Sequence, residues 1–131
     1  EGEREMRPYC REEHIAVIPY SPLAGGRLAR DSVTRRAELD AVAREKYEAS
    51  EEQDRKVIER AAELAQRRGV RLSHIALAWL LRKEPVAAPI VGATKPSHLE
   101  DAVKALDVSL TPDEIAYLEE LYVPHRVVGH V

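Results

Sequence analysis

IAVIPYSPLAGG, residues 15–26, joins a short apolar run to a turn that contains a proline and paired glycines. Residues 15–19 lack polar alternation and are mostly β-branched, which is typical of a strand covered on both faces in a parallel sheet. From Tyr20 to Gly26, the proline and the glycines forbid regular structure and favour a shaped loop. This stretch therefore predicts a buried strand whose carboxyl end runs into a loop.

The same order of features returns later in the chain. Residues 86–91, VAAPIV, form a second apolar run, which ends in Gly92-Ala93-Thr94-Lys95-Pro96. Amphipathic spacing predicts helices over residues 3–13, 51–68, 74–84, 97–106 and from 112 onward. Residues 27–49 have no clean period, so we expect a long loop there.

Capping signals mark where most of these helices should begin. Ser73 is expected to cap the helix that ends before Pro85, and capping boxes pair Ser50 with Gln53, Ser97 with Glu100 and Thr111 with Glu114. The apolar stripes of the two central helices are Val57, Ile58, Ala61, Leu64 and Ala65, and Ile75, Leu77, Ala78, Leu80 and Leu81. We expect these stripes, together with Trp79, to form the core.

The composition excludes several classes of function. The chain has 131 residues, and 20 Lys and Arg against 23 Asp and Glu give a formal net charge of −3. That balance argues against binding to nucleic acid or an anionic membrane, because both need a strongly basic face. No apolar run approaches the roughly 20 residues needed to cross a bilayer, and no signal segment opens the chain. The single cysteine, Cys10, suits a reducing compartment, so we expect a cytoplasmic protein.

The order of the elements indicates the α/β class. Short apolar strands that alternate with amphipathic helices imply parallel pairing with helical crossovers. Two strands leave two exposed edges, whereas a sheet with independent stability normally needs three or more strands. A (β/α)8 TIM barrel takes about 250 residues, and this chain opens on Glu1 rather than Met. We therefore expect residues 1–131 to be a partial domain, the carboxyl-terminal part of such a barrel: about its last two βα units plus the preceding helix and a carboxyl-terminal helix.

The loops that follow the two runs form the candidate functional site, because ligands of parallel α/β folds bind at the carboxyl ends of strands. Ser21 supplies a hydroxyl, and the backbone N–H groups of Leu23, Gly25 and Gly26 can approach an anion closely. Lys95 precedes a helix amino terminus, where free N–H groups and the helix dipole attract phosphate. Glycine-rich turns after strands are common, so a purely structural role for either loop is an equal alternative.

Three segments resemble the carboxyl-terminal part of the aldo-keto reductases. They are IAVIPYSPLAGGRL at residues 15–28, GATKPSHLEDAV at 92–103 and LEELYVPH at 118–125. The resemblance covers nearly the whole chain. It implies a (β/α)8 barrel that uses NADPH to reduce a small carbonyl substrate to an alcohol, with the remaining part of the barrel as the partner of this chain.

The resemblance also implies a set of cofactor-binding residues. Tyr20 would stack on the nicotinamide, and Ser21, Leu23 and Gly25 would lie along the pyrophosphate. The adenosine and its 2′-phosphate would be surrounded by Gly92, Thr94, Lys95, His98 and Asp101. Lys95 is expected to select NADPH over NADH, because the two cofactors differ only by that phosphate.

The chain departs from the family pattern at three positions. Family members often have Arg or Gln where His98 stands, Asn where Ala102 stands and a small residue where Pro19 stands. Ala102 lacks the amide that helps to hold the adenine, which implies a weaker adenine contact. The catalytic Asp, Tyr, Lys and His of the family lie on earlier strands, so we assign no catalytic residue and no metal site.

Other interpretations remain open. The same barrel serves as the cofactor-sensing β-subunit of potassium channels, so the alternatives are a non-catalytic NADPH-binding regulatory module and an inactive truncated product. A stand-alone helical interaction protein is disfavoured by the two apolar runs. For the remaining polar residues we expect ordinary roles. His74 lies in a helix first turn and needs no functional account, and His125 and His130 are too loosely spaced to form a metal pair. Arg27, Arg30, Arg35 and Arg36 are expected to form a solvated face, and the alternative is contact with the cofactor phosphates.

Overall fold

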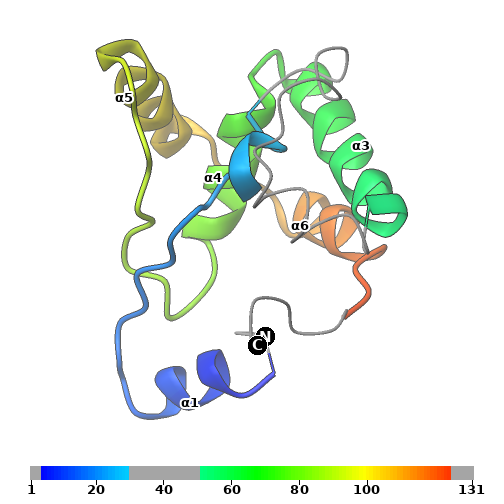
Figure 1. The fold of residues 1–131 in the computed structure, drawn as a ribbon. Coiled ribbons are helices and arrows are strands. Elements are labelled where there is room, and N and C mark those ends of the chain that lie inside the picture. The colour runs from blue at the N-terminus through cyan, green and yellow to red at the C-terminus, as the bar shows by residue number, and fades with distance from the viewer. Residues whose placement is uncertain (1–3, 30–50, 125–131) are drawn as a thin grey trace.

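The computed structural model describes residues 4–29 and 51–124, and a short first helix lies apart from the other helices (Figure 1). In chain order the elements are α1 (Met6–Glu12), the 3-10 turn η1 (Ala24–Gly26), α3 (Glu51–Arg68), α4 (Leu72–Leu81), α5 (Pro96–Val103), the 3-10 turn η3 (Lys104–Asp107) and α6 (Pro112–Glu119). α1 is therefore shorter than predicted. None of the described helices is both long enough and apolar enough to span a bilayer.

The core is helical, and α3 packs against both α4 and α6 (Figure 1). Its buried side chains are Ile58, Ala61, Leu64 and Ala65 of α3, Leu72, Ile75 and Ala78 of α4, and Leu110 and Leu118. The predicted stripe on α3 is confirmed except at Val57, which is half-buried. α4 is the more buried of the two central helices, because residues 72–78 are all buried. Trp79 packs against this core, as expected.

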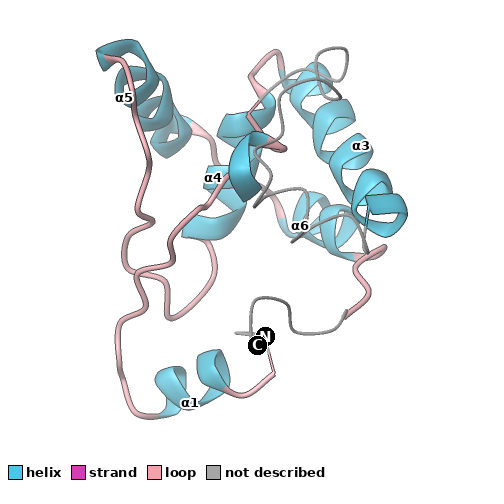
Figure 2. Ribbon diagram, viewed as in Figure 1, coloured by secondary structure: helices cyan, strands magenta, loops and turns pink. Residues whose placement is uncertain are grey.

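The two apolar runs pair in parallel, as predicted, but neither forms a strand. Figure 2 shows only helices and loops in the described part of the chain. Isolated parallel bridges join Val17 to Val86 and Tyr20 to Ile90. The Val17 carbonyl accepts from the Ala87 N–H at 2.9 Å. The pairing direction expected for an α/β fold is therefore present without a continuous ladder.

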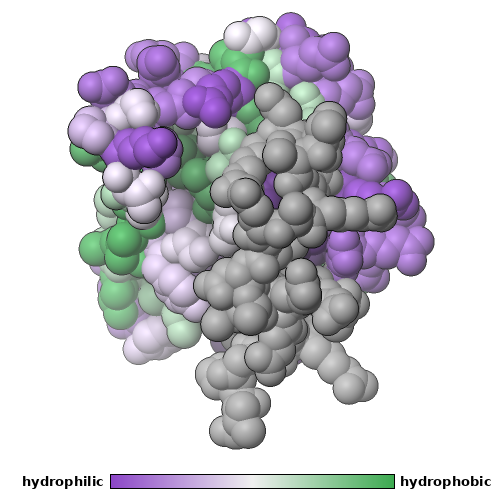
Figure 3. Space-filling view, turned by 45° about the horizontal axis from the view of Figure 1, so that its top comes forward, coloured by the Kyte–Doolittle hydropathy of each residue, from purple (hydrophilic) through white to green (hydrophobic). Residues whose placement is uncertain are grey.

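The prediction that these runs are buried is wrong. Ile18 is 59% exposed and Ile90 is 56% exposed. Pro19 and Pro89 have no N–H to give to a ladder, and among the described residues no third strand lies beside the pair. In Figure 3, apolar surface shows at the lower left and in a patch at the top, and hydrophilic residues cover the upper left and the right. The runs expose the surface that further strands of a parallel sheet would cover.

Two helices begin earlier than their predicted caps. α4 begins at Leu72 with Arg71 as its N-cap, so Ser73 and His74 lie inside the first turn and are buried. α5 begins at Pro96 rather than after Ser97, because proline at the first helical position has no N–H that needs a partner. α5 ends at Val103, and η3 continues to Asp107, so the end predicted near Leu106 falls in the 3-10 turn. The predicted cap Ser50 lies outside the described residues.

The capping box predicted at the start of α6 is confirmed. The Thr111 hydroxyl accepts from the Glu114 N–H at 3.3 Å, and Glu114 Oε2 accepts from the Thr111 N–H at 2.8 Å. Arg68 of α3 donates to both oxygens of the same carboxylate, at 2.7 and 2.5 Å. These bonds, led by the one from Arg68, lower the pKa of Glu114 from 4.5 to about 2. One carboxylate thus caps α6 and ties it to α3.

Acidification should weaken this connection. A carboxyl whose pKa is lowered by folding stabilises the protein above its unfolded pKa of 4.5, and this contribution is lost as the pH falls toward about 2. Glu114→Gln removes the titrating group. We therefore expect the difference in unfolding free energy between the wild type and Glu114→Gln to shrink from pH 6 to pH 2, measured by urea titration. Asp113→Asn is the control, and an equal change for both variants would contradict the assignment.

Candidate functional site

Two loops that are distant in the sequence line one groove of about 730 Å³. The bridge between Tyr20 and Ile90 sets the ends of the two runs side by side, so the loops that follow them face the same space. The first turn of α4 contributes Arg71 and Ser73 to the same groove. Six of the nine predicted cofactor-binding residues line it: Ser21, Leu23, Gly25, Gly92, His98 and Asp101.

The first loop has an unusual backbone. Ser21 and Ala24 have φ values of 52° and 49°, in the left-handed region that residues other than glycine rarely adopt. The Ser21 hydroxyl accepts from the Gly25 N–H at 3.3 Å, and the Leu23 carbonyl accepts from the Gly26 N–H at 3.0 Å. Both glycine N–H groups therefore donate within the loop in this structure. Strained backbone of this kind is concentrated at functional sites.

The second loop brings only part of its predicted set to the groove. Gly92 lines it, and a Cβ built on Gly92 would meet no atom within 4 Å. Thr94 Oγ1 lies 3.4 Å from His98 Nδ1. Neither Thr94 nor Lys95 lines the groove, and Lys95 is the exposed N-cap of α5. The structure therefore leaves open space beside Gly92 and places the predicted phosphate-binding lysine at the edge.

Tyr20 opens into a different hollow. Its ring is 72% exposed and lines an apolar cavity of about 420 Å³ together with Trp79, Leu118 and Tyr122. Ser21 and Pro22 line both this cavity and the groove. The two hollows thus adjoin at the start of the first loop, with an aromatic, apolar cavity on one side and a groove of mixed polar and apolar lining on the other.

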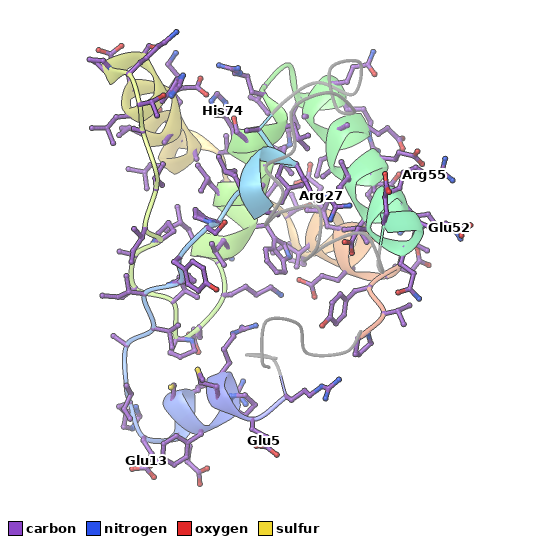
Figure 4. All side chains as sticks on the ribbon, in the orientation of Figure 1. Glu5, Glu13, Arg27, Glu52, Arg55 and His74 are labelled. Carbon is purple, nitrogen blue, oxygen red and sulfur yellow. The ribbon has the colours of Figure 1, made fainter. Side chains whose placement is uncertain are left out.

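A polar cluster between α4 and α5 closes one wall of the groove. Figure 4 shows His74 on α4 near α5. His74 Nε2 lies 3.0 Å from Asp101 Oδ1, Ser73 Oγ lies 3.4 Å from Oδ2, and the Arg71 guanidinium lies 3.1 Å from Oδ2. His74 Nδ1 accepts from the Arg71 N–H at 3.4 Å, so the tautomer with hydrogen on Nε2 donates to Asp101. His74 thus lies in the first turn of α4, as expected, and its contacts to Arg71 and Asp101 are structural.

The pKa of Asp101 reflects these contacts. Partial burial by itself raises that pKa, but the hydrogen bond from His74 and the charge of Arg71 outweigh burial and hold it below its usual range. The carboxylate thus stays ionised inside its ring of donors. The spacing of Arg71 and His74 could have indicated part of this cluster from the sequence. A histidine at the third helical position can accept a hydrogen bond from the N-cap N–H, as Glu or Gln does in a capping box.

Two other charged side chains, Glu119 and Arg27, have structural roles. Glu119 accepts from Trp79 Nε1 at 2.7 Å and pairs with Lys83. Arg27, labelled in Figure 4, is buried and pairs with Asp54 of α3 at 2.7 Å, so the solvated face predicted for it is wrong. The other three arginines of that series, together with His125 and His130, lie outside the described residues. Within residues 4–29 and 51–124, no group of three His, Cys, Asp or Glu could hold a metal ion.

Comparisons with known proteins agree with the resemblance drawn from the sequence. The model of the aldo/keto reductase family matches residues 2–123. The aldo-keto reductase dtxS3 of Metarhizium robertsii is 43% identical over 99% of this chain and 35% of its own length. The versiconal hemiacetal acetate reductase of Aspergillus parasiticus is 42% identical over 97% of this chain and 38% of its own length. The chain therefore spans little more than a third of the curated relatives it matches.

Proposed function

The chain belongs to the aldo/keto reductase family, and on that basis we propose that it is the carboxyl-terminal, cofactor-binding portion of a cytoplasmic NADPH-dependent reductase that converts aldehydes or ketones to alcohols. The groove carries this proposal, because it gathers residues from both loops of the family resemblance into one space. Two relatives that are themselves called reductases support it.

We also propose that the rest of a (β/α)8 barrel covers the apolar surface of this chain. Leu99, Val103 and Leu106 lie at helical spacing along α5 and η3 and are 56%, 54% and 69% exposed. Ile18 and Ile90 on the paired runs are exposed as well. Contiguous apolar surface of this kind marks an interface. Neighbouring strands and helices of the barrel would bury it.

The residues present fit the phosphate-bearing half of a dinucleotide. The open space beside Gly92 lets a ligand approach the backbone, and His98 and Ser21 offer polar groups along the groove. The exposed Tyr20 ring at the adjoining apolar cavity suits contact with a flat aromatic ring. When bound, NADPH supplies the hydride that reduces the carbonyl carbon. In this proposal Tyr20 orients the nicotinamide, the first loop holds the pyrophosphate, and Gly92, Thr94, Lys95, His98 and Asp101 surround the adenosine 2′-phosphate.

The proton donor is proposed to lie outside this chain. Tyr117 donates its hydroxyl hydrogen to Glu63 Oε2 at 2.6 Å, and this bond raises its pKa. A tyrosine that acts as a general acid needs a neighbour that lowers its pKa. The structure gives Tyr117 the opposite environment, so it connects α3 to α6. From the family resemblance, we propose that the catalytic Asp, Tyr, Lys and His lie on preceding strands of the barrel.

Lys95→Ala tests the cofactor assignment. The variant should weaken NADPH binding by at least about tenfold, since a charge-assisted contact to phosphate is lost, and should change NADH binding little. Dissociation constants from nucleotide fluorescence provide the measurement. Lys104→Ala removes the same charge from the exposed turn η3 and is the matched control. Equal losses for both cofactors would remove the 2′-phosphate role from Lys95.

An activity assay on the complete barrel distinguishes an enzyme from a non-catalytic regulatory module. We expect the complete barrel to oxidise NADPH when an aldehyde or ketone is added, followed by absorbance of the reduced nicotinamide. Tight NADPH binding without such turnover would instead favour the non-catalytic module. An absence of NADPH binding would contradict both.

A further inference from the structure

The positive charge of the groove comes from Arg71, a residue that the sequence analysis did not connect with the cofactor. Among the described residues that line it, Arg71 is the only Lys or Arg. It stands immediately before α4, on an element that the family resemblance did not connect with the cofactor. Lys95 lies at the N-cap of α5 and does not line the groove. The permanent positive charge inside the groove is therefore supplied by α4.

Arg71 can change partner at low cost. Its side chain is 64% exposed, and its contact to Asp101 is 3.1 Å long. Exposed ion pairs contribute little to stability, because water and salt screen them. Asp101 keeps its contacts to His74 and Ser73 if the guanidinium moves away. A guanidinium has five N–H donors, which match the oxygens of a phosphate better than an ammonium does.

We infer that Arg71 binds a phosphate group of the nucleotide, and that Asp101 holds the guanidinium in the groove until the phosphate takes its place. This inference rests on the proposed function and adds a binding residue to it. The ligand chemistry is a phosphate ester or diphosphate carried by an adenine nucleotide. The exchange keeps Asp101 paired to α4, so the wall of the groove survives ligand binding.

Arg71→Ala, made in the complete barrel that contains this chain, tests this inference by titration with NADPH and with NADH. Loss of a charged hydrogen bond should weaken binding by about tenfold or more. Arg71→Lys should recover part of the loss, because it keeps the charge but not the fork of donors. The backbone bond from the Arg71 N–H to His74 survives both substitutions, so α4 should keep its start, which circular dichroism checks. Arg82→Ala, at the C-cap of the same helix, is the matched control and should change affinity less than twofold.

The outcomes distinguish binding of the 2′-phosphate from binding of the diphosphate. They also distinguish failure of this inference from failure of the proposed function. A loss confined to NADPH assigns Arg71 to the 2′-phosphate, and an equal loss for both nucleotides assigns it to the diphosphate; either result supports the inference. Affinity as little changed as in Arg82→Ala would overturn it and leave the proposed function intact. A folded wild-type barrel that binds neither nucleotide would overturn the proposed function, and the inference with it.

Discussion

Replacing Ile75 by alanine should lower the free energy of unfolding by about 2–5 kcal/mol. Ile75 is 0% exposed and belongs to the cluster formed with α3, Leu110 and Leu118. It also borders the apolar cavity of about 420 Å³. Truncation would therefore enlarge an existing hollow, and a cavity that the surrounding helices fail to fill adds its own cost to the lost burial.

Urea unfolding followed by circular dichroism measures this effect. Leu106→Ala is the matched control, because it removes an aliphatic side chain that is 69% exposed. We expect the control to change stability by less than about 0.5 kcal/mol. Similar losses for both variants would mean that the helical cluster is not the core of this chain.

Asp101→Ala should produce the largest polar effect, about 1–3 kcal/mol. His74 is 6% exposed and donates to Asp101 at 3.0 Å. Without the carboxylate, a buried N–H has no acceptor and pays its full desolvation cost. α5 has no buried residue of its own, so its attachment to α4 depends on this carboxylate more than on packing.

Hydrogen exchange can localise this second effect. In Asp101→Ala the amides of α5 should lose protection, whereas those of α3 should keep most of theirs. Asp101→Asn retains an acceptor for His74 and should lose less. Asp107→Ala removes an exposed carboxylate from η3 and is the control. Uniform loss of protection across α3 and α5, or no loss at all, would show that the Asp101 cluster does not hold α5 in place.

Local signals predicted the helices well and the extended runs poorly. The box of Thr111 and Glu114 and the stripe from Ile58 to Ala65 depend on residues three or four apart, so the sequence contains them directly. The burial of residues 15–19 depends on neighbours at a distance, and among the described residues those neighbours are absent. The sequence predicted Ser73 and Ser97 as helix caps, but α4 and α5 begin earlier. Pro96 occupies the first position of α5, and the buried His74 accepts from the N-cap N–H of Arg71 in α4.

The candidate site shows the same division. The YSPLAGG and GATKPSH segments predicted two loops at one edge, and the bridge between Tyr20 and Ile90 brings them together. The partners of Asp101 are Ser73, His74 and Arg71, which precede it by 27 residues or more, a separation that no local pattern encodes. For the same reason, sequence reasoning predicted Lys95 as the phosphate-binding residue and did not identify Arg71.

Mapping of NADPH by amide chemical shifts on the complete barrel that contains this chain tests the central claim most directly. We expect saturable shifts in residues 21–26 and 90–102, together with Arg71, and little change along α3. Shifts confined to the cavity beside Trp79 and Tyr122, or no saturable shift, would contradict the claim that this groove holds the cofactor.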